Sequence, residues 1–178
     1  MIHQAAREMA VEHMGEDGWA RFAAANGLTD QHFIGPEYYQ DSETMELVAA
    51  IASHLKLEIA DALHTFGHHW IAFAGKSAYG RVLDMAGADL ESFLDNLDRM
   101  HASIKSNMPH ADMPSFQVMD SDDEGITLIY RSQRRGLEPF VAGILEAVGE
   151  RFGERVNIAY EPHADGVEFR LSRETVRA

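Results

Sequence analysis

The hydrophobic pattern of this chain changes its period near Pro114. Before that residue, apolar side chains recur every three or four positions, as they do in amphipathic helices. After it, they alternate with polar side chains in four segments that are typical of strands, with one helical segment among them. The expected strands are 115–119, 126–132, 155–161 and 166–172, and the helical segment is 137–153. Helices first and strands later predict an α+β fold, in which a four-stranded antiparallel sheet carries packed helices.

Residues that start or stop helices divide the first part of the chain. Gly15 separates two expected helices, Asp41 or Ser42 can cap a third, and Asp89 can cap the longest one. The segment 28–42 has no clean period and is expected to be a loop. The expected helices are 3–14, 17–25, one ending at Leu55, 58–73, 77–85 and 90–107.

Composition excludes several classes of protein. The 178 residues suffice for one domain with a real core, and they carry a formal net charge of −14. That charge opposes binding to nucleic acid or to an anionic membrane surface. With no cysteine, the chain has no disulfide, no thiolate metal site and no covalently attached haem. No apolar run approaches the length of a membrane span, and no signal segment opens the chain, so we expect a cytoplasmic location.

The expected helix 90–107 carries an imidazole on its apolar side. His101 completes the stripe formed by positions 90, 94, 97, 101, 104 and 108. Such a histidine is often a core residue whose ring nitrogens bond to the backbone. The alternative is a metal ligand, for which neutral imidazole is the commonest side chain.

A row of polar side chains on the second expected strand favours the alternative. Side chains alternate along a strand, so Tyr130, Ser132 and Arg134 should share one face. Haem iron needs only one imidazole from the protein, because the porphyrin supplies four nitrogens. The two haem propionates need hydrogen-bond donors, and an arginine can grip a carboxylate bidentately. A non-covalent b-type haem between helix and strand would therefore explain His101 and the polar row together.

Several short segments, in this order, resemble the haem-nitric oxide/oxygen binding (H-NOX) family, which includes the regulatory domain of animal soluble guanylate cyclase. They are MGEDGW, YYQDSETMELVAAIASHL, FGHHWIAFAG, FLDNLDRMH, MPSF, YRSQRRGL and VAGIL. The resemblance implies one H-NOX domain over 1–178, with haem between a helical distal subdomain (1–60) and an α+β haem-binding subdomain (61–178).

The resemblance also implies the roles of individual residues. His101 would be the proximal iron ligand, and Tyr130, Ser132 and Arg134 would bind the propionates. Pro114 would press on the porphyrin. The apolar residues expected to line the pocket are Phe73, Phe140, Ile144 and, on the distal side, Ile2, although the chain starts closer to this residue than is usual in the family.

Phe140 decides the expected ligand selectivity. Oxygen-binding members of the family carry a distal tyrosine at this position, which donates a hydrogen bond to bound oxygen. Phenylalanine has no donor, so we expect a sensor that binds nitric oxide and carbon monoxide but not oxygen. By resemblance, nitric oxide releases His101 from the iron. A separate protein would read the signal, typically, in bacterial relatives, a histidine kinase or a diguanylate cyclase or phosphodiesterase. The domain itself would not be an enzyme.

Two other functions stay open on the sequence. His64 and His68 lie four residues apart on an expected helix, a spacing that places both on one face, as in zinc hydrolases. No glutamate of an HExxH motif lies between them, and no third ligand is obvious. The second possibility is a haem-free carrier of a hydrophobic carboxylate, in which Arg134 would hold the acid.

Overall fold

The computed structural model describes residues 2–29, 33, 41–77, 79–107 and 112–174. Helices fill the first part of the chain, and a four-stranded sheet with one further helix fills the second. The expected α+β fold is therefore confirmed. The elements are α1 (Ile2–Ala25), α2 (Asp41–Leu55), α3 (Ile59–Lys76), α4 (Gly80–Ala86), α5 (Leu90–Asp95), α6 (Leu97–Asn107), β1 (Ser115–Ser121), β2 (Gly125–Arg131), α7 (Glu138–Arg151), β3 (Val156–His163) and β4 (Gly166–Arg173).

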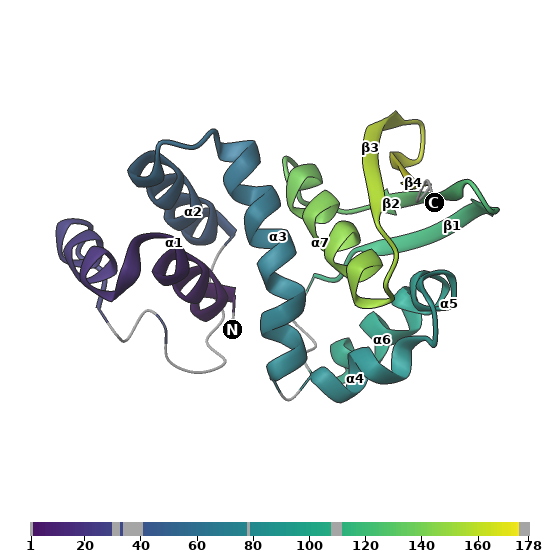
Figure 1. The fold of residues 1–178 in the computed structure, drawn as a ribbon, viewed down its shortest axis with the longest axis horizontal. Coiled ribbons are helices and arrows are strands. Elements are labelled where there is room, and N and C mark those ends of the chain that lie inside the picture. The colour runs from purple at the N-terminus through teal and green to yellow at the C-terminus, as the bar shows by residue number, and fades with distance from the viewer. Residues whose placement is uncertain (1, 30–32, 34–40, 78, 108–111, 175–178) are drawn as a thin grey trace.

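Helix α3 occupies the middle of the molecule (Figure 1). Helices α1 and α2 pack on one side of α3, and α7 packs along its other side. Within the described residues, the contact between α3 and α7 is more extensive than that of α3 with any other element. Helix α7 also contacts β3 and β4, so it joins α3 to the sheet. Helices α5 and α6 contact β1, which brings the expected ligand helix to the edge of the sheet.

Some helix boundaries follow the residues that the sequence indicated, and others differ from the expected ones. Gly15 breaks α1 with φ 74° and ψ 167°, a conformation that side chains disfavour, so two helical stretches meet there as expected. Asp89 caps α5 by accepting from the backbone of Ser92, and the Ser92 side chain completes a capping box. The single helix expected over 90–107 is instead two, because α5 ends at Asp95, Asn96 is its C-cap, and α6 begins at Leu97. Helix α2 already begins at Asp41, and residues 30–32 and 34–40 of the expected loop lie outside the described residues.

The sheet has the strand order β1-β2-β4-β3, and every neighbouring pair is antiparallel. Strands β3 and β4 form the expected hairpin, closed where His163 pairs with Gly166. Strand β2 ends at Arg131, before the expected end at Ser132. The expectation that Ser132 and Arg134 continue the face of a strand is therefore wrong, since both lie in the loop that leads to α7.

Two clusters of buried side chains form the interior. The helical core joins α1, α2 and the first half of α3, and the sheet core joins the second half of α3 with α4–α7 and the sheet. Phe66 of α3 belongs to the helical core and Ile71 to the sheet core, while Trp70 packs against both. The two cores thus meet along α3, and a subdomain division at residue 60 stays a prediction.

The backbones of α3 and α7 approach each other closely at two glycines. A Cβ atom on Gly67 would run into the carbonyl oxygen of Phe140, and one on Gly143 would run into that of His64. Only glycine fits at these crossings, which fixes the position of the first turn of α7 relative to α3.

Candidate functional site

His101 projects from α6 toward the start of β1. Its Nδ1 atom lies 3.1 Å from the carbonyl oxygen of Pro114, and its ring centroid lies 5.8 Å from that of Phe116. A carbonyl oxygen can only accept, so Nδ1 must carry the proton and donate it. The lone pair of the neutral ring is then on Nε2, as in a histidine that binds a metal while its other nitrogen bonds to the backbone.

The surroundings of His101 favour this neutral form. Burial lowers the pKa of His101, while the hydrogen bond to Pro114 and the charge of Asp98 raise it by less. The pKa of the imidazole therefore falls below its ordinary value near 6.5. At neutral pH the ring is uncharged and offers a lone pair.

Asp98 fastens α6 to β1 beside His101. One oxygen of its carboxylate accepts from the backbone nitrogen of Phe116 at 2.7 Å, and the other accepts from the hydroxyl of Ser115 at 2.7 Å. His101 is the third residue after Asp98, so both side chains lie on one side of α6. We did not identify Asp98 from the sequence, where the spacing to His101 was the only available signal.

The three polar residues expected to act together do lie together, although not along a strand. Tyr130 is 4% exposed and sits at the end of β2. The Oγ atom of Ser132 accepts from the backbone nitrogen of Arg134 at 3.0 Å, and Ser132 lies close enough to Tyr130 to lower the pKa of its hydroxyl. This turn brings the charge of Arg134 close enough to act on the Tyr130 hydroxyl. The loop therefore gathers the groups that an extended strand would have spaced apart.

Tyr130 stays a hydrogen-bond donor at neutral pH. Burial raises the pKa of Tyr130, against the lowering effect of the Ser132 hydrogen bond; the charge of Glu138 raises it further and that of Arg134 lowers it. The net shift is upward from the ordinary value of 10.0. A protonated phenol beside a guanidinium is suited to a carboxylate.

Phe116 connects the histidine to these donors. Its ring centroid lies 5.8 Å from that of His101 and 5.2 Å from that of Tyr130. Phe116 pairs with Tyr130 across β1 and β2, so the sheet register sets this spacing. The register of a strand pair cannot be read from either strand alone, so no role for Phe116 was predicted from the sequence.

The expected pocket-lining residues are half-buried. Ile2, Phe73 and Phe140 pack against the helical core, and Ile144 packs against the sheet core. The Phe140 ring lies 5.2 Å from that of Phe66, which positions it over α3. These residues come from α1, α3 and α7 and lie at the margins of the two cores.

Together, these residues fit the requirements of a haem group. A neutral imidazole with a free Nε2 suits axial ligation, and Tyr130, Ser132 and Arg134 supply donors suited to carboxylates. Half-buried apolar side chains suit the porphyrin.

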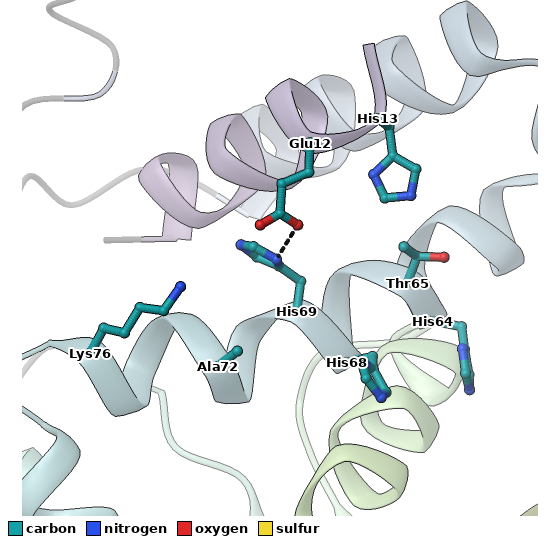
Figure 2. A pocket seen from close by; sticks show the side chains of 8 residues that line it. All are labelled: Glu12, His13, His64, Thr65, His68, His69, Ala72 and Lys76. Carbon is teal, nitrogen blue, oxygen red and sulfur yellow. Dashed lines mark ion pairs between the residues drawn. The ribbon is translucent and has the colours of Figure 1, made fainter. Parts of the chain in front are cut away.

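The three histidines of the HTFGHHW segment do not form one cluster. The Nε2 atoms of His64 and His68 each lie 3.0 Å from a carboxylate oxygen on α7, of Glu146 and Glu150 respectively. His69 points the other way, toward α1 (Figure 2). Within the described part of the chain, neither His64 nor His68 belongs to a group of three potential metal ligands. The geometry thus offers no support for a zinc hydrolase built on these two residues.

The helices in the described part are all too short or too polar to cross a membrane.

The fold matches solved structures of H-NOX proteins. An H-NOX protein from S. oneidensis in the Fe(II)NO ligation state has a TM-score of 0.82 at 20% identity, with 98% of this chain and 98% of that chain covered. An oxygen-binding H-NOX domain related to soluble guanylate cyclases has a TM-score of 0.76 at 18% identity, with 96% of this chain and 92% of that chain covered. At these identities the likeness establishes the fold.

Curated relatives and a family match identify the chain further. Soluble guanylate cyclase gcy-35 of Caenorhabditis elegans is 29% identical over 157 residues, which cover 84% of this chain and 22% of the cyclase. The beta-2 subunit of soluble guanylate cyclase of Rattus norvegicus is 37% identical over 90 residues, 51% of this chain and 13% of that subunit. The chain thus spans about a fifth of the length of the cyclases that it matches. Residues 1–160 match the family described as Haem-NO-binding, HNOB. The chain belongs to this family and is an H-NOX haem gas-binding sensor domain.

Proposed function

We propose that this domain senses nitric oxide at a non-covalent b-type haem. Bound haem would supply an iron atom that binds a diatomic gas. His101 would hold this iron through Nε2, because Nδ1 is engaged by Pro114. The single observation that carries the proposal is this hydrogen bond, which fixes the tautomer that a metal needs.

The remaining side chains of the site would orient the porphyrin. Tyr130, Ser132 and Arg134 would bind its propionates by charge-assisted and neutral hydrogen bonds. Pro114, whose carbonyl accepts a hydrogen bond from the ring of the proximal histidine, would also press on the porphyrin. The apolar lining would consist of Ile2, Phe73, Phe140 and Ile144.

Selectivity against oxygen would come from Phe140. An oxygen ligand develops partial negative charge and is stabilised by a hydrogen-bond donor. The phenyl ring offers none and lies against Phe66, another apolar ring. Nitric oxide and carbon monoxide depend less on such a donor, so both should bind.

Signalling would begin with the release of His101 from iron. Its helix, α6, would then lose one of its attachments, while Asp98 still holds the first turn of α6 to β1. A helix with two arrangements of this kind is the bistable element that allostery requires. We propose a cytoplasmic signalling partner, either a histidine kinase or a diguanylate cyclase or phosphodiesterase.

The absorption spectrum of the ferrous protein tests this function. We expect the ferrous protein to show a strong Soret band. Nitric oxide should shift this band to the position of a five-coordinate species, and air should produce no stable oxygen complex. Retention of the histidine bond with nitric oxide would contradict release of His101. A stable oxygen complex would contradict the selectivity, and a colourless protein would favour the haem-free carrier.

A further inference from the structure

Two carboxylates on α1 face one imidazole on α3, at the place where these two helices lie side by side. Glu8 and Glu12 lie four residues apart on α1, so they share one face of that helix. The Nδ1 atom of His69 lies 3.2 Å from a carboxylate oxygen of Glu12 (Figure 2). Its Nε2 atom lies 3.8 Å from a carboxylate oxygen of Glu8. One ligand atom from each residue can be chosen such that all three lie within 4.8 Å of one another.

The imidazole of His69 has an unsatisfied nitrogen inside this cluster. The side chain is only 9% exposed, and Nε2 is buried without a hydrogen-bond partner. If Nδ1 donates its proton to Glu12, the lone pair on Nε2 points toward the region of the Glu8 carboxylate. If Nε2 is protonated instead, its proton is buried too far from Glu8 for a hydrogen bond. Either arrangement leaves the buried Nε2 atom without a hydrogen-bond partner, which costs free energy. A cation between Nε2 and the carboxylates would bind the lone pair that Nε2 carries in the first arrangement.

The charges around His69 favour a divalent ion. Glu8 and Glu12 together carry two negative charges, and their side chains are 40% and 56% exposed, which leaves an entry path from solvent. Lys76 already places its ammonium 3.6 Å from the Glu8 carboxylate, so one positive charge is present at the rim. His13 and His68 line the same hollow, but His13 bonds to the carbonyl of Met9 and His68 pairs with Glu150. The buried nitrogen thus belongs to His69 alone among these three histidines.

We propose that Glu8, Glu12 and His69 bind a divalent transition-metal cation, for which Zn²⁺ is a suitable probe. One imidazole nitrogen with two carboxylate oxygens is a donor set that zinc accepts, and it leaves a coordination position for water. Tetrahedral zinc with ligands at about 2.1 Å requires donor separations of about 3.4 Å. The 3.8 Å between Nε2 and Glu8 is close to this value, and rotation of the Glu12 side chain from Nδ1 toward Nε2 would complete the site.

The ion would join α1 to α3. Helix α1 carries Ile2 and α3 carries Phe73, two of the proposed pocket-lining residues, so the metal would fix the distance between the helices that bear them. The site is distinct from His101, which lies on α6. It would exist whether or not the domain binds nitric oxide.

Zinc titration of the purified protein, after chelator treatment and dialysis, tests the proposal. We expect one equivalent of Zn²⁺ to bind in calorimetry, and X-ray absorption at the zinc edge to show one imidazole with oxygen ligands. Iron does not absorb at that edge, so bound haem does not interfere. His69→Ala should weaken binding by more than about 100-fold and Glu12→Gln by more than about 10-fold, because each removes a ligand.

Matched variants separate this site from other zinc-binding groups. Glu16→Gln, on the same helix as Glu12, and His68→Ala, next to His69, should bind zinc as tightly as the unmodified protein. Lys76→Gln should strengthen binding, since it removes a competing positive charge, and this gain does not depend on whether His69→Ala folds. Failure of the unmodified protein to bind zinc, equal binding by folded His69→Ala, or loss of binding in His68→Ala would each overturn the proposal.

Discussion

His101 donates a hydrogen bond from Nδ1 to the carbonyl oxygen of Pro114, with 3.1 Å between the two atoms. The bond joins α6 to the residue that precedes β1, so the orientation of the imidazole depends on the path of the chain into the sheet. Burial simultaneously lowers the pKa of the ring. These two effects together prepare Nε2 of His101 as a ligand.

Replacing His101 with Gly should remove the protein ligand to the haem iron. The ferrous spectrum should lose the features of histidine ligation, and free imidazole in the buffer should restore them by occupying the space of the missing side chain. Absorption spectra with and without imidazole measure this. His68→Gly serves as the control, because it also introduces glycine into a helix but should leave the spectrum unchanged. An unaltered spectrum of the His101→Gly protein would show that another residue binds iron.

Arg134→Ala should weaken haem retention, whereas Arg131→Ala should not. Arg134 lies in the turn next to Tyr130 and Ser132, whereas Arg131 lies within β2 and should point to the other side. A charge-assisted hydrogen bond is worth about 1.5–3 kcal/mol, so haem should leave the Arg134→Ala protein at least about 10-fold faster. The rate of haem transfer to apomyoglobin measures the difference. Equal rates for the two variants would remove Arg134 from the site.

The sequence predicted the elements better than the contacts between them. The change of hydrophobic period near Pro114 gave the α+β order, and Gly15 and Asp89 gave two helix boundaries, because period, backbone freedom and capping are local properties. The stop at Asn96 and the end of β2 at Arg131 were missed, since tertiary packing overrides a continuous apolar stripe.

For the candidate site, the sequence indicated which residues carry the chemistry but not how they are supported. His101 and Tyr130 stood out by their residue type and position. The roles of Phe116 and Asp98 depend on which strands pair and on where α6 meets β1, and neither relationship is encoded in local spacing. His69 had no predicted role, although it adjoins His68 in the sequence: one residue of helix rotation turns it toward α1 instead of α7.

Asp98→Ala should loosen α6 from β1. The variant loses hydrogen bonds to the backbone of Phe116 and to Ser115, so we expect the free energy of unfolding to fall by about 1–2 kcal/mol. The iron–histidine stretching frequency should also shift, because His101 sits on the same helix. Urea unfolding and resonance Raman spectroscopy check the two effects. Asp95→Ala, which removes an exposed aspartate on α5, is the control and should change neither the free energy of unfolding nor the stretching frequency. An unchanged Raman frequency in Asp98→Ala would mean that Asp98 does not position His101.

Phe140→Tyr should give the protein a measurable affinity for oxygen. The new hydroxyl would supply the donor that the phenyl ring lacks, at a half-buried position in the first turn of α7. Ferrous protein exposed to air should then show the spectrum of an oxygen complex, while the unmodified protein should not. Phe152→Tyr, at the other end of α7, is the matched control. If the unmodified protein binds oxygen as well as Phe140→Tyr does, Phe140 does not set the selectivity.

Gly67→Ala should damage both stability and the gas site, although alanine favours helices. At Gly67 the added methyl group would meet the carbonyl oxygen of Phe140, so α3 and α7 must separate. Overpacking of this kind costs about 1–3 kcal/mol, more than the gain of up to about 1 kcal/mol in helix propensity. Thermal unfolding should show a lower melting temperature, and nitric oxide or carbon monoxide binding rates should change because the first turn of α7 carries Phe140. Gly75→Ala lies on the same helix, where the nearest neighbour of the new Cβ would be a side-chain nitrogen of Arg151 at 3.8 Å, an ordinary contact. That variant should match or exceed the unmodified stability, so equal effects of the two substitutions would contradict the close crossing of α3 and α7.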